Sequence, residues 1–148
     1  MKKKVLGLLV TVVAVFALNG CGSSSDTVIV EPLPPESELT TLFLVDINGG
    51  GIEFVPYTCY APDGSIVSDT VTPINGEFSF VPGDRCEFDL LGFPSDILEP
   101  LYIADIDGFG KEDIPFNCIN DLDISTAGVT DFDGLFAYPA DAYCKFYL

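Results

Sequence analysis

Several residues have types and a spacing that suit metal binding. They lie in the stretch LYIADIDGFGKEDIPFNC, residues 101–118. Asp105, Asp107 and Asp113 are spaced like successive oxygen ligands of a calcium loop, and glycines stand between them. Phe109 occupies a position at which such a loop needs a further oxygen. Two interpretations stay open. The stretch is either a weak calcium site or a glycine-rich turn between strands, in which aspartates cap the backbone.

An internal repeat bears on every candidate site in this chain. LFLVDINGGGIEFVPYTC (42–59) aligns with LYIADIDGFGKEDIPFNC (101–118) at a constant offset. VTPINGEFSFVPGDRCEFDL (71–90) aligns with VTDFDGLFAYPADAYCKFYL (129–148) when one deletion is allowed. The chain therefore contains a duplicated unit, and a residue needed for shared structure should recur in both copies.

The duplication divides the three aspartates of the opening stretch. Asp105 has an acidic counterpart, Asp46, whereas the counterparts of the other two aspartates are Asn48 and Phe54. The pattern resembles the DxDGxGxxD calcium loops of extracellular repeat proteins, and that resemblance implies a weak calcium site. The repeat favours the turn, because Phe54 at the position of Asp113 offers no oxygen ligand, whereas turn positions accept Asn in place of Asp.

The elements that carry these residues are predicted to be β-strands. Fourteen glycines and eleven prolines divide the chain into short pieces rich in Phe, Val, Ile and Tyr, a pattern typical of all-β folds. We expect tandem duplicated β-meander units that form one small disulfide-stapled β-sandwich. The predicted strands lie near residues 41–46, 52–60, 65–72, 77–81, 85–90, 101–105, 112–119, 124–130, 135–138 and 143–148. The Asn75-Gly76 and Asp133-Gly134 pairs predict type I′ hairpins.

Alternation of side chains predicts which residues of these strands face the core. The expected inward residues are Val55, Tyr57, Cys59, Phe78, Phe80, Cys86, Phe88, Leu90, Ile114, Phe116, Cys118, Phe136, Tyr138, Cys144, Phe146 and Leu148. Four cysteines belong to this set, and four cysteines allow three pairings. The duplication favours one bridge within each repeat, namely Cys59–Cys86 and Cys118–Cys144. Zinc is disfavoured because no two of these cysteines have the close spacing of a zinc ligand pair.

The first 25 residues carry signals for export. Three lysines precede a run of uncharged, mostly apolar residues, 5–18, which suits the h-region of a signal peptide and is too short to span a bilayer. Leu18-Asn19-Gly20-Cys21 resembles the lipobox of bacterial lipoproteins, which implies cleavage before Cys21 and its acylation, as with palmitate. Gly22 implies the outer membrane by the same analogy. The alternative is an ordinary signal peptide that leaves a fifth, free cysteine.

These features suggest a division of the chain into five parts. We expect a signal peptide (1–20), a lipidated and proline-rich tether (21–40), a first β repeat (41–92), a linker (93–100) and a second β repeat (101–148). The whole chain has a net charge of −17. Loss of residues 1–20 would remove three of the six basic residues and leave 3 − 23 = −20. Such a surface repels phosphate backbones, so nucleic acid is not an expected partner.

The span GIEFVPYTCYAPDGSIVSDTVTPINGEFSFVPGDRCEFDL (51–90) resembles the transthyretin-like or carboxypeptidase-regulatory-like modules of bacterial surface proteins. Residues 110–148 resemble them more loosely. The modules share a "G-x-F-x-F" strand, which is present here as GEFSF (76–80). The resemblance implies a β-sandwich that binds, spaces or displays.

The expected function is that of a cell-envelope lipoprotein that serves as a non-catalytic binding, structural or display module. Its partners would be the membrane, through the lipid, and an envelope protein or polysaccharide. No cofactor is expected beyond weak calcium. The chain contains no histidine, so histidine-based catalytic triads are excluded. Two alternatives remain, a calcium-dependent adhesin or sensor that uses the Asp105–Asp113 loop and a carboxylate-based hydrolase.

Overall fold

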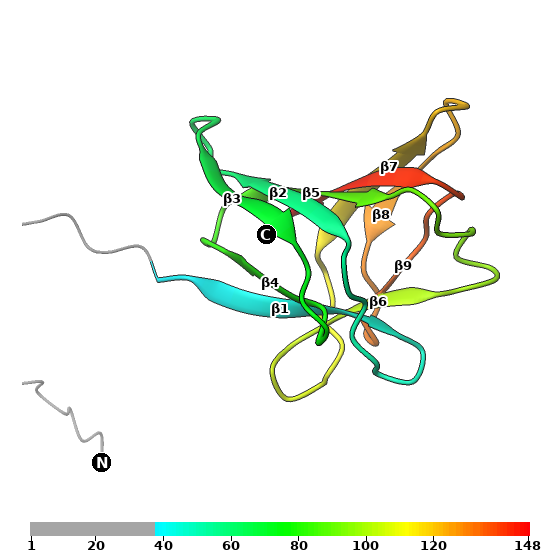
Figure 1. Ribbon diagram of the computed structural model, residues 1–148, viewed down its shortest axis with the longest axis horizontal. Helices are drawn as coiled ribbons and strands as arrows, with labels where there is room; N and C mark the ends of the chain where they lie inside the picture. Colours follow the sequence, from blue (N-terminus) through cyan, green and yellow to red (C-terminus); the bar gives the residue numbers. More distant parts are fainter. Residues whose placement is uncertain (1–37) are drawn as a thin grey trace, which may run out of the picture. The chain divides into compact units, whose positions relative to one another are not determined.

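The computed structural model describes residues 38–148, and the description of the fold refers to this part of the chain. Within these residues the chain forms ten β-strands and no helix (Figure 1). Residues 38–148 thus include no helix long and apolar enough to cross a membrane. The strands are β1 (Thr40–Asp46), β2 (Pro56–Tyr60), β3 (Ile66–Val71), β4 (Glu77–Phe80), β5 (Arg85–Leu90), β6 (Leu101–Ala104), β7 (Pro115–Asn120), β8 (Ser125–Val129), β9 (Leu135–Phe136) and β10 (Ala142–Tyr147).

The strands form two antiparallel sheets that face each other as a sandwich (Figure 1). One sheet has the order β4-β1-β6-β9 and the other has the order β3-β2-β5-β10-β7-β8. Each repeat contains one hairpin of consecutive strands, β2–β3 or β7–β8, and its other strands divide between the sheets. The repeats meet at the β1–β6 and β5–β10 pairs, so both sheets continue through both repeats. The two copies are therefore halves of one sandwich, related by an approximate two-fold axis.

The core lies between the sheets and contains the residues that alternation predicts. Fifteen of the sixteen expected inward residues are buried, with exposed fractions of at most 7%, and Leu148 packs partly buried against them. A row of rings crosses the repeat boundary: Phe78–Phe88, Phe88–Phe146 and Phe146–Phe136 have centroid separations of 4.9, 5.6 and 4.9 Å. Such pairs contribute about 0.5–1.5 kcal/mol each beyond the burial of their area. The aromatic core therefore holds the two repeats together.

Two predicted strands begin later than expected. Residues 52–55 and 112–114 lie outside β2 and β7, because Phe54 and Asp113 adopt the left-handed backbone conformation with φ of 61° and 63°. A buried threonine hydroxyl adds two hydrogen bonds to the backbone bonds of this segment. Thr72 Oγ1 accepts a hydrogen bond from the Val55 amide (3.0 Å) and donates one to the Ile52 carbonyl (2.6 Å). Thr130 makes the equivalent two bonds in the second repeat.

The type I′ hairpins predicted at Asn75-Gly76 and Asp133-Gly134 are wrong. These turns link β3 to β4 and β8 to β9, which are strands of different sheets. Only the glycine of each pair has a positive φ, whereas a type I′ turn requires positive φ at both central residues. The amide of each glycine closes a four-residue turn, Gly76 on the Pro73 carbonyl (2.8 Å). The glycine is needed because the turn passes directly over a neighbouring strand.

Candidate binding surfaces

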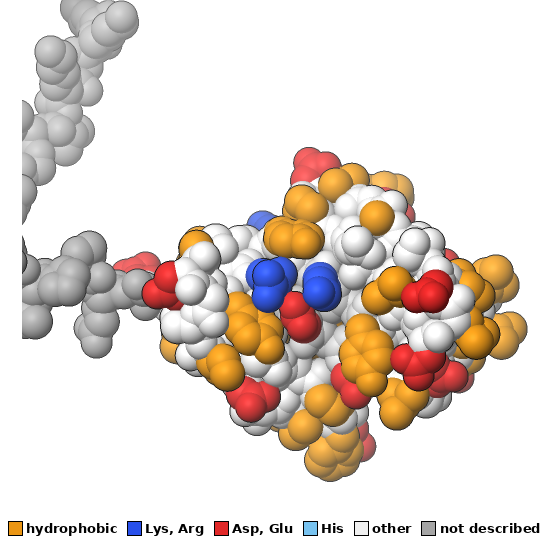
Figure 2. Space-filling model, turned by 90° about the horizontal axis from the view of Figure 1, so that it is seen from above, with side chains coloured by type: hydrophobic (Ala, Val, Ile, Leu, Met, Phe, Trp, Pro, Cys, Tyr) orange, Lys and Arg blue, Asp and Glu red, His pale blue; other side chains and the backbone are white. Residues whose placement is uncertain are grey.

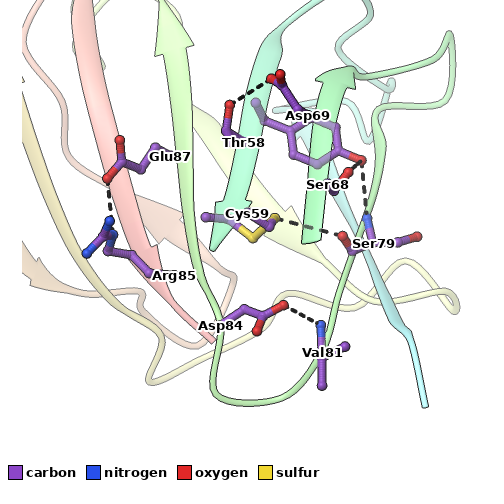
Figure 3. The surroundings of a disulfide bond; sticks show 11 residues. Thr58, Cys59, Ser68, Asp69, Ser79, Val81, Asp84, Arg85 and Glu87 are labelled. Carbon is purple, nitrogen blue, oxygen red and sulfur yellow. Dashed lines mark hydrogen bonds and ion pairs between the residues drawn. A yellow bond between two sulfur atoms is a disulfide. The ribbon is translucent and has the colours of Figure 1, made fainter. Parts of the chain in front are cut away.

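The two cysteine bridges predicted from the repeat are confirmed. Cys59 pairs with Cys86, and Cys118 pairs with Cys144. Each bridge joins directly opposed residues of neighbouring strands, β2–β5 or β7–β10. All four cysteines have an exposed fraction of 0%. Figure 3 shows Cys59 on the inner side of its strand, where its sulfur lies 3.8 Å from the Ser79 carbonyl oxygen of the facing sheet. The bridges therefore link neighbouring strands within the core and are not accessible to solvent.

The three aspartates of the predicted calcium loop have different structural roles. Asp105 Oδ1 accepts hydrogen bonds from the Asp107 amide (3.0 Å) and the Phe109 amide (2.9 Å), which caps the turn after β6. Asp46 caps the turn after β1 in the same way. Asp113 occupies the left-handed position that Phe54 occupies in the first repeat. Within residues 38–148 no group of three or more acidic or cysteine side chains is placed to hold a metal ion. Calcium binding stays a prediction.

The outer face of the four-stranded sheet carries a groove with an apolar floor. Leu42, Leu44, Leu101 and Ile103 point into the core, so the residues between them point outward. Two directly opposed pairs form the floor: Phe43 with Ala104, and Val45 with Tyr102. Two pockets of about 410 and 170 Å³ occupy this face.

The lining of the two pockets reflects the duplication. The larger pocket contains Asp46, Ile47, Tyr102 and Asp133, and the smaller one contains their repeat counterparts Asp105, Ile106, Phe43 and Asn75. Both pockets also touch Val45, Ala104 and the loop glycines Gly49 and Gly108. The groove is therefore one surface with two similar halves, built across the approximate two-fold axis.

The walls of the groove are the loops that follow β1 and β6, residues 46–51 and 105–110, which both extend away from the six-stranded sheet (Figure 1). Each loop is closed by two side-chain and two backbone hydrogen bonds of its first residue. Apolar side chains nevertheless stand exposed on the loops: Ile47, Ile106 and Phe109 have exposed fractions of 67, 76 and 71%. Large apolar side chains held outward around an apolar floor make this face a candidate interaction surface.

The neighbouring turns add to this apolar surface. Gly51 packs closely against the backbone of Asn75, and Gly110 packs in the same way against the backbone of Asp133. Each turn between the sheets therefore lies beside one groove loop. These turns carry Ile74 and Phe132 at equivalent positions, with exposed fractions of 79 and 75%. We refer to the floor residues, the loops 46–51 and 105–110 and the turns 73–76 and 131–134 together as the loop face.

The outer face of the six-stranded sheet carries charged side chains together with exposed apolar and aromatic ones, among them Ile119 and Tyr147. Glu87 Oε1 lies 3.1 Å from Arg85 Nε and 3.5 Å from Lys145 Nζ, and the Arg85 guanidinium lies 5.1 Å from the Tyr60 ring centroid. Figure 2 shows this face, with two basic side chains on either side of an acidic one. These ion pairs are exposed, so each contributes about 0–1 kcal/mol. Tyr143 is 44% exposed here.

The sequence contained a signal for the groove that alternation alone did not use. LFLV (42–45) and LYIA (101–104) are apolar at every position, a pattern that indicates a strand covered on both faces. In the structure one face is in the core and the other forms the groove floor. The predicted lipidation site, Cys21, lies outside the described residues.

Comparison of the chain with models of protein families, with curated proteins and with solved structures finds no match.

Proposed function

We propose that this protein is a lipid-anchored cell-envelope protein that acts as a non-catalytic binding module through its loop face. Its leader supports the location: a basic start, a short apolar run and the Leu18-Asn19-Gly20-Cys21 sequence. Acylation of Cys21 with two or more chains would hold the protein on a membrane, because each buried methylene contributes about 0.8 kcal/mol.

The cysteine bridges support a location outside the cytoplasm. Disulfides form and persist in oxidising compartments, and small domains there use them to supplement a modest core. Both bridges are fully buried between adjacent strands of one sheet. A core built around two such bridges requires a compartment in which they can form.

The observation that carries the binding role is the apolar outer face of the four-stranded sheet. An antiparallel sheet with one solvated face normally carries polar residues there. Phe43, Val45, Tyr102 and Ala104 occupy these positions instead, and exposed loop residues stand around them. The floor residues themselves are buried or half-buried, whereas Ile47, Ile106 and Phe109 on the loops are largely exposed, so a partner that covers these loop residues gains binding free energy.

The proposed lipid anchor at Cys21 is tested by labelling with a palmitate analogue in the native host. We expect label on the protein and none on Cys21→Ala, which should also leave the membrane fraction. Equal labelling of both proteins would contradict the anchor.

The binding role is tested by a photo-crosslinking residue placed at position 106 in living cells, with position 122 as the control. Both sites are exposed, Ile106 by 76% and Leu122 by 78%, but only Ile106 belongs to the loop face. We expect a discrete adduct from position 106 alone. Adducts from both positions, or from neither, would contradict binding at this face.

A further inference from the structure

We infer that the loop face binds a polypeptide segment that combines apolar side chains with lysine or arginine. This inference rests on the proposed binding role and names the chemistry of the partner. Two features of the surface lead to it, the apolar floor with its exposed loop residues and the sign of the charges around them.

The apolar features fit side chains of a polypeptide. The floor pairs Phe43 with Ala104 and Val45 with Tyr102, and the two pockets of about 410 and 170 Å³ lie side by side on it. Protein interfaces have a centre of this composition, surrounded by a polar rim. Ile106 and Phe109 stand at the rim with three quarters of their surface free. An extended segment that presents alternate side chains to the two pockets would cover both.

The charges around the groove are negative. Asp46, Asp105 and Asp133 line the pockets, and Asp107 belongs to the same wall as Asp105. Among the lining residues of this described surface there is no lysine or arginine. Complementary charges favour association and exclude partners of like sign. A basic partner therefore fits this rim.

The same charges disfavour the other candidate occupants. A second copy would bring an identical acidic rim against this one, on a chain whose net charge is −17. An anionic lipid surface would meet the same repulsion, since juxtamembrane attraction depends on basic residues. Both occupants are nevertheless outcomes that the experiment below distinguishes.

The rim charges can be removed without loss of structure, because the repeat supplies tolerated substitutes. Asp107→Asn and Asp133→Asn place in the second repeat the residues that the first repeat carries, Asn48 and Asn75. In the described part of the chain neither carboxylate accepts a hydrogen bond; both aspartates donate through their amides. The double variant therefore changes charge and preserves the turns.

The test uses a synthetic ten-residue peptide in which lysines alternate with valines and one tryptophan replaces a valine. The protein contains no tryptophan, so tryptophan emission reports the peptide alone. A second peptide has glutamate in place of lysine. Binding of each peptide to the purified protein is measured at low and at physiological salt.

The control variant is Asp121→Asn with Asp123→Asn, which removes the same total charge from the turn between β7 and β8. We expect Asp107→Asn with Asp133→Asn to weaken lysine-peptide binding about 3- to 10-fold, and the control pair to change it less than about 2-fold, since distant charges are screened. Equal losses in both pairs would show attraction to net charge alone and overturn the inference.

The apolar contribution is tested in the same assay. Ile106→Ser with Phe109→Ser should weaken binding about 10-fold, because both large apolar side chains would lose the area that the peptide covers. Leu122→Ser, at an equally exposed position away from the groove, should leave it unchanged. Unchanged binding in the double variant would place the peptide elsewhere and overturn the inference.

Three outcomes would replace the inferred partner. Equal binding of the glutamate peptide would show that charge does not select the ligand. Self-association of the protein that Phe109→Ser abolishes would assign the face to a second copy, and binding to anionic phospholipid vesicles that the same variant abolishes would assign it to lipid. None of these results alters palmitate labelling of Cys21, so the proposed location stands or fails separately.

Discussion

Two glycines with the same backbone conformation are predicted to respond very differently to alanine. Gly134 and Gly108 have φ values of 81° and 80°. A Cβ atom at Gly108 would meet nothing within 4 Å, whereas one at Gly134 would lie 2.0 Å from the carbonyl oxygen of Ile103. The pair thus separates the cost of the left-handed conformation from the cost of the close approach between turn and strand.

The magnitude follows from what the Gly134 turn holds in place. Alanine in the left-handed region costs about 1–2 kcal/mol, and both variants incur this cost. Gly134→Ala must also move the turn away from β6, which breaks the hydrogen bond from the Ile103 amide to the Gly134 carbonyl (2.9 Å) and disturbs the bond that the Ile103 carbonyl accepts from Lys111 (2.8 Å). Each bond contributes about 1 kcal/mol net. We expect a loss of about 1–2 kcal/mol for Gly108→Ala and of at least about 3 kcal/mol for Gly134→Ala.

The assay is reversible unfolding in urea with the cysteine bridges intact, followed by far-ultraviolet circular dichroism. The first repeat provides a replicate, because Gly76 and Gly49 have φ values of 74° and 77° and only Gly76 faces a carbonyl oxygen, at 2.1 Å. Gly128→Ala is the neutral control: its Cβ would meet Phe116 at 3.5 Å, an ordinary contact. Free-energy losses that agree within about 0.5 kcal/mol for Gly134→Ala and Gly108→Ala would refute the close-approach argument.

Three further predictions concern the staples, a buried phenol and the candidate calcium loop. Removing one bridge by Cys59→Ala with Cys86→Ala should lower the free energy of unfolding by about 3–4 kcal/mol, as expected for a closed loop of about 27 residues; a loss below about 1 kcal/mol in urea unfolding would contradict a stapling role. Burial raises the pKa of Tyr138 far above its usual value. The folded state then holds this proton more tightly than the unfolded state, so its contribution to stability is complete below pH 10 and declines above it. Absorbance at 295 nm during an alkaline titration should show one phenol that ionises only with unfolding, and Tyr138→Phe should remove that step. If the calcium interpretation holds, calorimetry with about 1–10 mM calcium gives heat that Asp105→Asn with Asp107→Asn abolishes; the absence of heat from the unchanged protein would dismiss it.

Much of the sandwich was predictable because the repeat and the alternation of side chains act locally. Cys86, Phe88 and Leu90 recur as Cys144, Phe146 and Leu148, and period-two spacing places each set on one face. The bridge partners followed from the same duplication and are confirmed. The beginnings of β2 and β7 were missed because nothing in the local sequence shows that Phe54 adopts a positive φ. The hydrogen bonds that accompany this conformation come from Thr72, a buried residue 18 positions further along the chain, through both its hydroxyl and its backbone.

The candidate site was predictable only in its parts. The sequence determined that glycine loops follow two strands, that their aspartates sit in equivalent positions and that the cysteines lie in the core. It could not place Asn75-Gly76 in a crossing between sheets, because a hairpin and a crossing use the same turn residues. Only the tertiary structure set β1 beside β6, which brings Val45 opposite Tyr102 and makes one groove from two repeats. The physical reason is that strand order depends on how whole faces pack together, whereas turn chemistry and alternation are decided within a few residues.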